Sequence, residues 1–157
     1  MKKIIVIVLA GIMLTAFSIP KNELPVTTDV VELTGYKLRS NIIDRSDFNL
    51  WVVTSEDVFE TDFEPEHDSV LRPRFEVQMV LAAKVETVHN SYRVKFKKTE
   101  LVNGTLNVYF NVKREGPAAE VTMPVSMIAV PKDRSMKKVN FYHDNVLVKT
   151  VPIVTVY

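Results

Sequence analysis

Alternation between apolar and polar side chains is the feature that most limits how this 157-residue chain can fold. From Tyr92 to Lys97 the chain alternates strictly, with Tyr92, Val94 and Phe96 on one side and basic residues on the other. Successive side chains of a β-strand point to opposite faces of the sheet, whereas a helix needs a period of 3.6 residues. The segment therefore predicts a strand with one buried face.

Turn residues separate this strand from others of the same kind. Asn103-Gly104 lies between apolar runs, and it favours a type I′ hairpin because both central residues of that turn need a positive φ. Residues 106–112 alternate again after it. A second hairpin is predicted where His143-Asp144-Asn145 separates the apolar runs 139–142 and 146–148.

Other apolar runs complete the strand pattern. Gly35 separates two short runs, 30–33 and 36–39, which indicate two short strands or one bent strand. Leu50 to Thr54 and Phe75 to Val85 predict core strands, and the second becomes continuously apolar, as a central strand does. Val121 to Val130 predicts a further strand, interrupted at Pro124.

One segment predicts a helix. Thr54 or Ser55 is the expected N-cap, acidic residues follow in the first turn, and Pro65 is expected to end the helix. Glu64 to Arg74, which is rich in charge and proline, predicts a surface loop. The fold class expected from all these segments is mainly β: an antiparallel sandwich or partly open barrel of roughly seven to nine strands with one short α-helix.

The first 18 residues differ from the rest and predict a secretory signal. Lys2 and Lys3 precede an uncharged apolar run from Ile4 to Phe17, and Ala16 and Ser18 place small residues at positions −3 and −1 of a cleavage site. Fourteen residues of helix would span only about 21 Å, short of the roughly 30 Å hydrocarbon core. We therefore expect residues 1–18 to be a signal peptide, and an uncleaved membrane anchor is the alternative.

Cleavage would leave residues 19–28 as a flexible or extended lead-in and residues 29–157 as a single β-rich domain. Without Lys2 and Lys3, the 20 basic residues fall to 18 against 19 acidic ones, so the mature net charge is −1. That balance argues against nucleic-acid binding. The chain has no cysteine, which excludes disulfides, thiolate sites and a lipid-modified cysteine. We expect a periplasmic or secreted protein with no transmembrane span after cleavage.

No catalytic arrangement emerges from the sequence. His67, His89 and His143 could in principle bind zinc, but they lack the close spacing of typical sites. We expect no catalytic residue, no metal and no cofactor, and we keep a metal-dependent hydrolase on these histidines as the less favoured alternative.

Two charged runs have both a structural and a functional interpretation. Five acids alternate between Glu60 and Asp68, which predicts solvated loop charge or attraction of a basic partner. Arg93, Lys95, Lys97 and Lys98 form the polar face of the alternating strand; alternatively, they contact an acidic partner or an anionic envelope surface.

Between Arg74 and Lys132 a series of short motifs follows in a fixed order. They are Met79-Val80-Leu81-Ala82, Thr87 to Tyr92, Val94-Lys95-Phe96, Asn103-Gly104, Gly116-Pro117 and Val130-Pro131-Lys132. This order resembles the PrcB-like domain, a family named after the non-catalytic subunit of a bacterial surface protease complex. The family's Gly-Gly pair is replaced here by Asn90-Ser91, and the tyrosine that follows it is kept as Tyr92.

This resemblance implies an exported, non-enzymatic module that binds or stabilises another protein, with a protease among the candidate partners. It places the expected partner-contact loop at Asn90, Ser91 and Tyr92. A protease inhibitor built on a β-sandwich is the alternative binding function.

Overall fold

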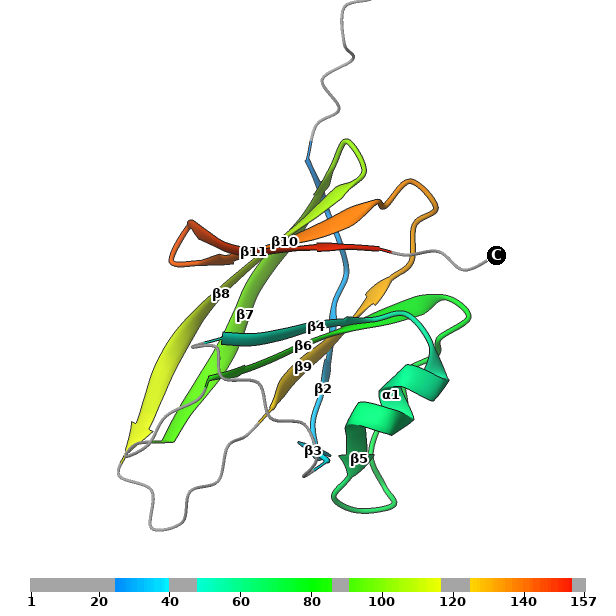
Figure 1. Cartoon of the computed structure of the whole chain (residues 1–157), viewed down its shortest axis with the longest axis vertical. Coiled ribbons are helices and arrows are strands. Elements are labelled where there is room, and N and C mark those ends of the chain that lie inside the picture. Colours follow the sequence, from blue (N-terminus) through cyan, green and yellow to red (C-terminus); the bar gives the residue numbers. More distant parts are fainter. Residues whose placement is uncertain (1–24, 40–47, 86–90, 117–124, 154–157) are drawn as a thin grey trace, which may run out of the picture.

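The computed structural model describes residues 25–39, 48–85, 91–116 and 125–153. Within these ranges the chain is mainly β with one short helix, as predicted, and its sheets do not close into a barrel (Figure 1). The described residues contain eleven strands, more than the predicted seven to nine. The two strands that lie outside the predicted segments, Val26–Thr27 and Phe63–Pro65, are only two and three residues long, too short to show a repeating pattern in the sequence.

The largest sheet, sheet A, has five strands in the order β1-β7-β8-β10-β11. Neighbouring strands are antiparallel except β8 and β10, which run parallel. The strands are β1 (Val26–Thr27), β7 (Ser91–Val102), β8 (Thr105–Gly116), β10 (Lys138–His143) and β11 (Val146–Pro152). Residues 26 and 27 of the predicted lead-in are thus extended and pair with β7.

Sheet B is a second antiparallel sheet in the order β2-β9-β6-β4. Its strands are β2 (Val31–Leu33), β9 (Ser126–Pro131), β6 (Gln78–Val85) and β4 (Phe48–Val53). A small antiparallel pair, β3 (Tyr36–Leu38) with β5 (Phe63–Pro65), forms sheet C. Gly35 has φ +79° and stands between β2 and β3, so the two predicted short strands are separate and lie in different sheets.

Helix α1 spans Glu56–Asp62, with Ser55 as its N-cap residue and two acids in its first turn. The prediction that Pro65 ends this helix is wrong. Phe63 already has extended backbone, and its side chain is buried, so the chain turns directly into β5. The predicted loop from Glu64 to Arg74 is corrected in the same way, because Glu64 and Pro65 pair with β3.

Two predicted strands start later than expected. Phe75 to Val77 form a turn, closed by hydrogen bonds from the amides of Val77 and Gln78 to the carbonyl of Arg74, so β6 begins at Gln78. In the segment predicted over Val121 to Val130, β9 begins at Ser126, and Pro124 lies outside the described residues.

Both predicted hairpins are confirmed. Asn103 and Gly104 have φ values of 49° and 73°, the pair of positive angles that a type I′ turn requires. Asp144 and Asn145 have φ values of 48° and 67° in the second hairpin, between β10 and β11.

Sheet B is the middle layer of the molecule and buries side chains on both faces. Met79, Leu81 and Ala83 of β6 pack toward sheet A, while Val80 and Ala82 pack toward α1 and sheet C. A strand that is covered on both faces needs apolar residues at every position, which explains the continuous apolar run of β6. Figure 1 shows α1 and sheet C on the side of sheet B that faces away from sheet A.

No helix in the described part of the chain is long and apolar enough to cross a membrane. The predicted signal peptide, residues 1–18, lies outside the described residues.

Candidate functional site

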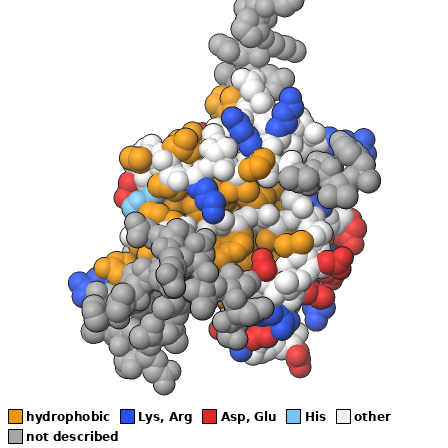
Figure 2. Space-filling model, in the orientation of Figure 1, with side chains coloured by type: hydrophobic (Ala, Val, Ile, Leu, Met, Phe, Trp, Pro, Cys, Tyr) orange, Lys and Arg blue, Asp and Glu red, His pale blue; other side chains and the backbone are white. Residues whose placement is uncertain are grey.

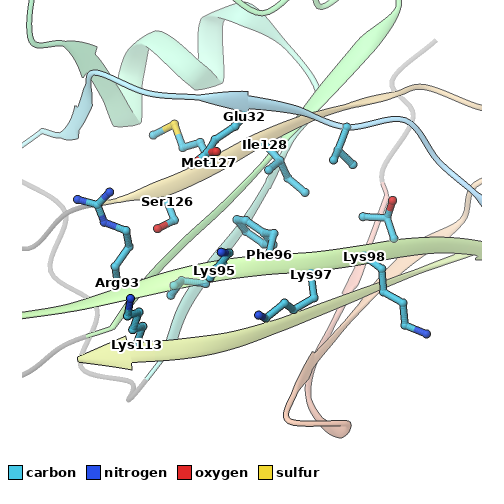
Figure 3. A pocket seen from close by; sticks show the side chains of 13 residues that line it. Glu32, Arg93, Lys95, Phe96, Lys97, Lys98, Lys113, Ser126, Met127 and Ile128 are labelled. Atoms are coloured by element: carbon cyan, nitrogen blue, oxygen red, sulfur yellow. The ribbon is translucent and has the colours of Figure 1, made fainter. Parts of the chain in front are cut away.

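A groove of about 510 Å³ lies where the β7 side of sheet A meets the β2 and β9 side of sheet B. Figure 3 shows β7 along one wall and β2 and β9 along the other. The groove is lined by Val30, Glu32, Arg93, Val94, Lys95, Phe96, Lys97, Lys98, Thr99, Lys113, Ser126, Met127 and Ile128.

The floor of the groove is apolar. Val94 on β7 and Ile128 on β9 are buried in the core between the two sheets, and Phe96 is half-buried beside them. The alternation of β7 produces this surface, because every second side chain of the strand turns inward. The floor therefore offers apolar contact to a chain that enters from outside.

The rim of the groove is strongly basic. Four of its cationic side chains come from consecutive or alternate positions of β7, and Lys113 comes from β8. Glu32 is the one acid among the described residues that line the groove. The chain as a whole is almost neutral, so five cations against one carboxylate is a local concentration of positive charge. The site favours an anionic partner.

The five cations differ in the residues that surround them. Arg93 lies directly opposite Lys113 in the β7–β8 register, and like charges in directly opposite positions destabilise a sheet. Lys98 is held differently: its Nζ lies 2.9 Å from Glu100 Oε1 and 4.5 Å from the ring centre of Tyr109. The hydrogen bond that Lys98 donates to the carboxylate of Glu100 raises the pKa of Lys98. Within the described ranges, Lys95, Lys97 and Lys113 form no ion pair.

The backbone of β7 is open along the groove. One edge of Tyr92–Phe96 pairs with β8 in regular register, and β1 covers the other edge only at Glu100 and Leu101. No described strand pairs with that outer edge from Tyr92 to Phe96. The groove thus borders a row of backbone donors and acceptors that can pair with another strand.

A pair of threonines closes one end of the groove. Between β1 and β2 the chain crosses from sheet A to sheet B, and Val30 in this crossing lines the groove. The Thr99 hydroxyl donates to the carbonyl of Thr28 at 3.1 Å, and the amide of Thr28 donates to the carbonyl of Thr99 at 3.4 Å. The crossing is therefore fixed to β7 at the point where the open edge ends.

Two residues of the predicted partner-contact loop, Ser91 and Tyr92, belong to β7. Tyr92 is half-buried in β7, opposite Arg114, and it directly precedes Arg93 of the rim. Ser91 is the first residue of β7. Asn90 lies outside the described residues.

The two described histidines lie in different parts of the fold. His143, at the end of β10 in sheet A, stacks on Phe110 with 5.5 Å between ring centres and contacts Asp144 at 3.3 Å. His67 follows β5 of sheet C and accepts or donates a hydrogen bond with Ser69 at 3.2 Å. His89 lies outside the described residues. The described ranges hold no group of three His, Cys, Asp or Glu side chains that could bind a metal.

The acidic segment from Glu60 to Asp68 is divided among several elements. Glu64 in β5 pairs with Lys37 at 3.1 Å and with Arg39 at 3.2 Å, which ties sheet C together. Asp62 ends α1, and burial raises the pKa of its carboxyl. Of these two acids, Glu64 forms ion pairs and Asp62 is half-buried at the end of the helix.

Sequence reasoning identified the β7 cations but missed Lys113 and the far wall of the groove. Lys113 could have been found by following the register back from the Asn103-Gly104 turn, with allowance for one extra residue in β7. Glu32, Ser126 and Met127 carry no such signal, because they come close to β7 only through the packing of two sheets.

Comparison with known proteins gives no further guide to the site: no family model, no curated protein and no solved structure matches this chain.

Proposed function

We propose that this chain is an exported, non-enzymatic module that binds or stabilises another protein, in the manner that the PrcB-like resemblance implies. The observation that carries the proposal is the groove beside β7. It combines an apolar floor, a basic rim and an open strand edge in one place. A polypeptide segment can use all three, since it brings apolar side chains, charged side chains and backbone hydrogen-bonding groups together.

The proposal is tested by recovering the partner from native cells. The chain, tagged at its C-terminus, is captured from the cell-envelope fraction alongside the variant Lys95→Glu/Lys97→Glu, which reverses two rim charges. The matched control is Lys137→Glu/Lys138→Glu, which reverses two exposed charges that do not line the groove.

The wild-type chain and the control should recover the same defined protein, and the groove variant should lose it. Recovery of no defined protein by the wild-type chain contradicts the binding function. Equal recovery by the groove variant contradicts the assignment of binding to the groove.

The exported state is tested separately. Cleavage after Ser18 predicts that the protein isolated from the periplasm or medium starts at Ile19, which intact mass and N-terminal sequencing will show. A chain that keeps residues 1–18 and remains with the membrane would instead support the anchor alternative.

A further inference from the structure

We propose that the partner segment is an acidic, extended strand that pairs with the open edge of β7 at Tyr92–Phe96 and so extends sheet A by one strand. This inference rests on the proposed function and adds the chemistry of the bound segment.

The open edge has a defined length. Five consecutive residues of β7, from Tyr92 to Phe96, pair one-to-one with β8, and a register irregularity bounds this stretch at each end. At about 3.3 Å per residue the stretch is roughly 17 Å long. Beyond Phe96 the extra residue Lys97 breaks the ladder, and β1 then covers the edge. A guest strand of about five residues fits between these limits.

The apolar floor and the basic rim beside the open edge determine which side chains the bound strand should carry. A strand added beside β7 has side chains on two faces, one toward the apolar floor formed by Val94, Phe96 and Ile128 and one toward the outer rim. Cations dominate that rim, as Figure 3 shows for Arg93, Lys95, Lys97 and Lys113. The matching sequence alternates apolar residues with Asp or Glu.

The same charges discriminate against other occupants. If a second copy of this chain paired edge to edge, basic strands would lie beside each other, and lysines on edge strands commonly prevent such pairing. An anionic lipid or polysaccharide would satisfy the rim but would leave the strand edge and the apolar floor unused. An acidic strand is the occupant that uses all three features.

The test uses synthetic heptapeptides as probes. The first alternates Val and Glu, and the second alternates Val and Lys. Two further copies of the Val/Glu peptide carry N-methyl groups, one on every Val and the other on every Glu. Alternate amides of a strand point to opposite edges, so each methylated peptide blocks one edge only. Binding is measured by titration, and amide exchange of β7 is followed by NMR.

The Val/Glu peptide should bind and should slow amide exchange within Tyr92–Phe96, while the Val/Lys peptide should not bind. One methylated peptide should bind at least about tenfold more weakly and the other should bind nearly unchanged, because only one edge of the guest meets β7. Lys95→Glu/Lys97→Glu should weaken binding by about tenfold or more, and Lys137→Glu/Lys138→Glu should not weaken it.

Several results would overturn the proposal. Equal binding of both methylated peptides would mean that charge alone holds the segment. Tighter binding to phosphatidylglycerol vesicles than to the peptide would favour an envelope surface, and a dimer in sedimentation that excludes the peptide would favour a second copy. Absence of peptide binding up to about 1 mM would also reject it. If the envelope capture still recovers a groove-dependent partner, the proposed function stands and only the strand pairing fails.

Discussion

Thr99 shows how one buried polar residue shapes the edge of the groove. Its side chain is only 1% exposed, and its hydroxyl donates to the carbonyl of Thr28 across 71 residues of sequence. A buried hydroxyl without a partner is costly, so the contact both satisfies Thr99 and holds the crossing between β1 and β2. The open part of β7 begins where this contact ends.

Replacing Thr99 with Val tests that role, because the shape is kept while the donor is lost. We expect Thr99→Val to lower the free energy of unfolding by about 1 kcal/mol, since the carbonyl of Thr28 loses this hydrogen bond. The control is Thr150→Val, which removes an exposed hydrogen bond to Asn140 and should cost less. Urea unfolding measures both, and an equal cost would contradict the role assigned to Thr99.

Asp62 is placed unfavourably for a carboxylate. It ends α1, where the helix dipole is negative and the last turn of the helix itself contains no basic residue, and burial raises the pKa of its carboxyl. A pKa higher in the folded than in the unfolded state means that the folded state holds the proton more tightly. The ionised carboxylate therefore destabilises the fold at neutral pH, and this effect disappears as the pH falls through the raised pKa.

We therefore expect Asp62→Asn to stabilise the protein at pH 7 by about 0.3–1 kcal/mol and to have a smaller effect near pH 3. Asp57→Asn is the control, because Asp57 lies in the first turn of α1, where a negative charge is favourable. That variant should destabilise the protein at pH 7. Thermal unfolding at both pH values measures the difference, and the same sign for both variants would contradict this account.

At the scale of elements, the β7–β8 hairpin positions the groove. Its turn depends on Gly104, which has φ +73°, and a Cβ there would lie 2.5 Å from the carbonyl oxygen of Ser135. The amide of Lys137 also donates to the carbonyl of Gly104 at 2.7 Å. The turn thus anchors the segment that leads into β10, and neither the angle nor the space allows a side chain at this residue.

Gly104→Ala should cost at least about 2 kcal/mol, from the left-handed backbone and the steric contact together. Asn103→Gly, at the neighbouring positive φ, should change stability much less, since glycine adopts that angle without strain. Urea unfolding of the two variants makes the comparison. A mild effect of Gly104→Ala would show that the segment near Ser135 can move away.

Several elements follow from local patterns, and the rest depend on contacts that are distant in sequence. The Asn103-Gly104 hairpin, the alternation of β8 and the helix start at Ser55 are local properties, and the structure confirms them. The bulge in β7 can be recognised in the sequence once the structure is known. Lys97 and Lys98 are two polar residues in succession between the inward-facing Phe96 and Thr99.

The parallel pairing of β8 with β10 could not be predicted in this way. Alternation shows which face of a strand is buried, but it is the same whether a neighbour runs parallel or antiparallel. The groove has the same limitation, since Glu32 and Met127 approach β7 only when the two sheets pack. Its basic rim was predictable from one strand, whereas its apolar floor was not.

At the scale of the whole molecule, sheet B couples two cores. One core lies between sheets A and B, and the other lies between sheet B and the layer of α1 and sheet C. Figure 2 shows acidic side chains on the side where α1 lies and a band of hydrophobic side chains across the face between β11 and β4. Because β6 contributes to both cores, loss of either one exposes a face of the same strand.

This coupling predicts that the molecule unfolds as one unit. Trp51, the single tryptophan, belongs to the core on the α1 side and packs edge-on against Phe63 at 5.7 Å between ring centres. Its fluorescence reports on that core, whereas far-UV circular dichroism reports mostly on the sheets. The two signals should therefore give the same midpoint in urea.

Phe59→Ala is the sharpest test of the coupling. Phe59 is buried in the core on the α1 side and contacts Tyr36, Phe63 and Phe75, with ring centres 5.1–5.4 Å apart. Its truncation should cost about 3–5 kcal/mol and should shift both signals together, although sheet A contributes nothing to that core. An earlier transition in Trp51 fluorescence alone would show that α1 and sheet C unfold separately. The groove between sheets A and B would then survive that loss, and binding of the Val/Glu peptide would persist in the variant.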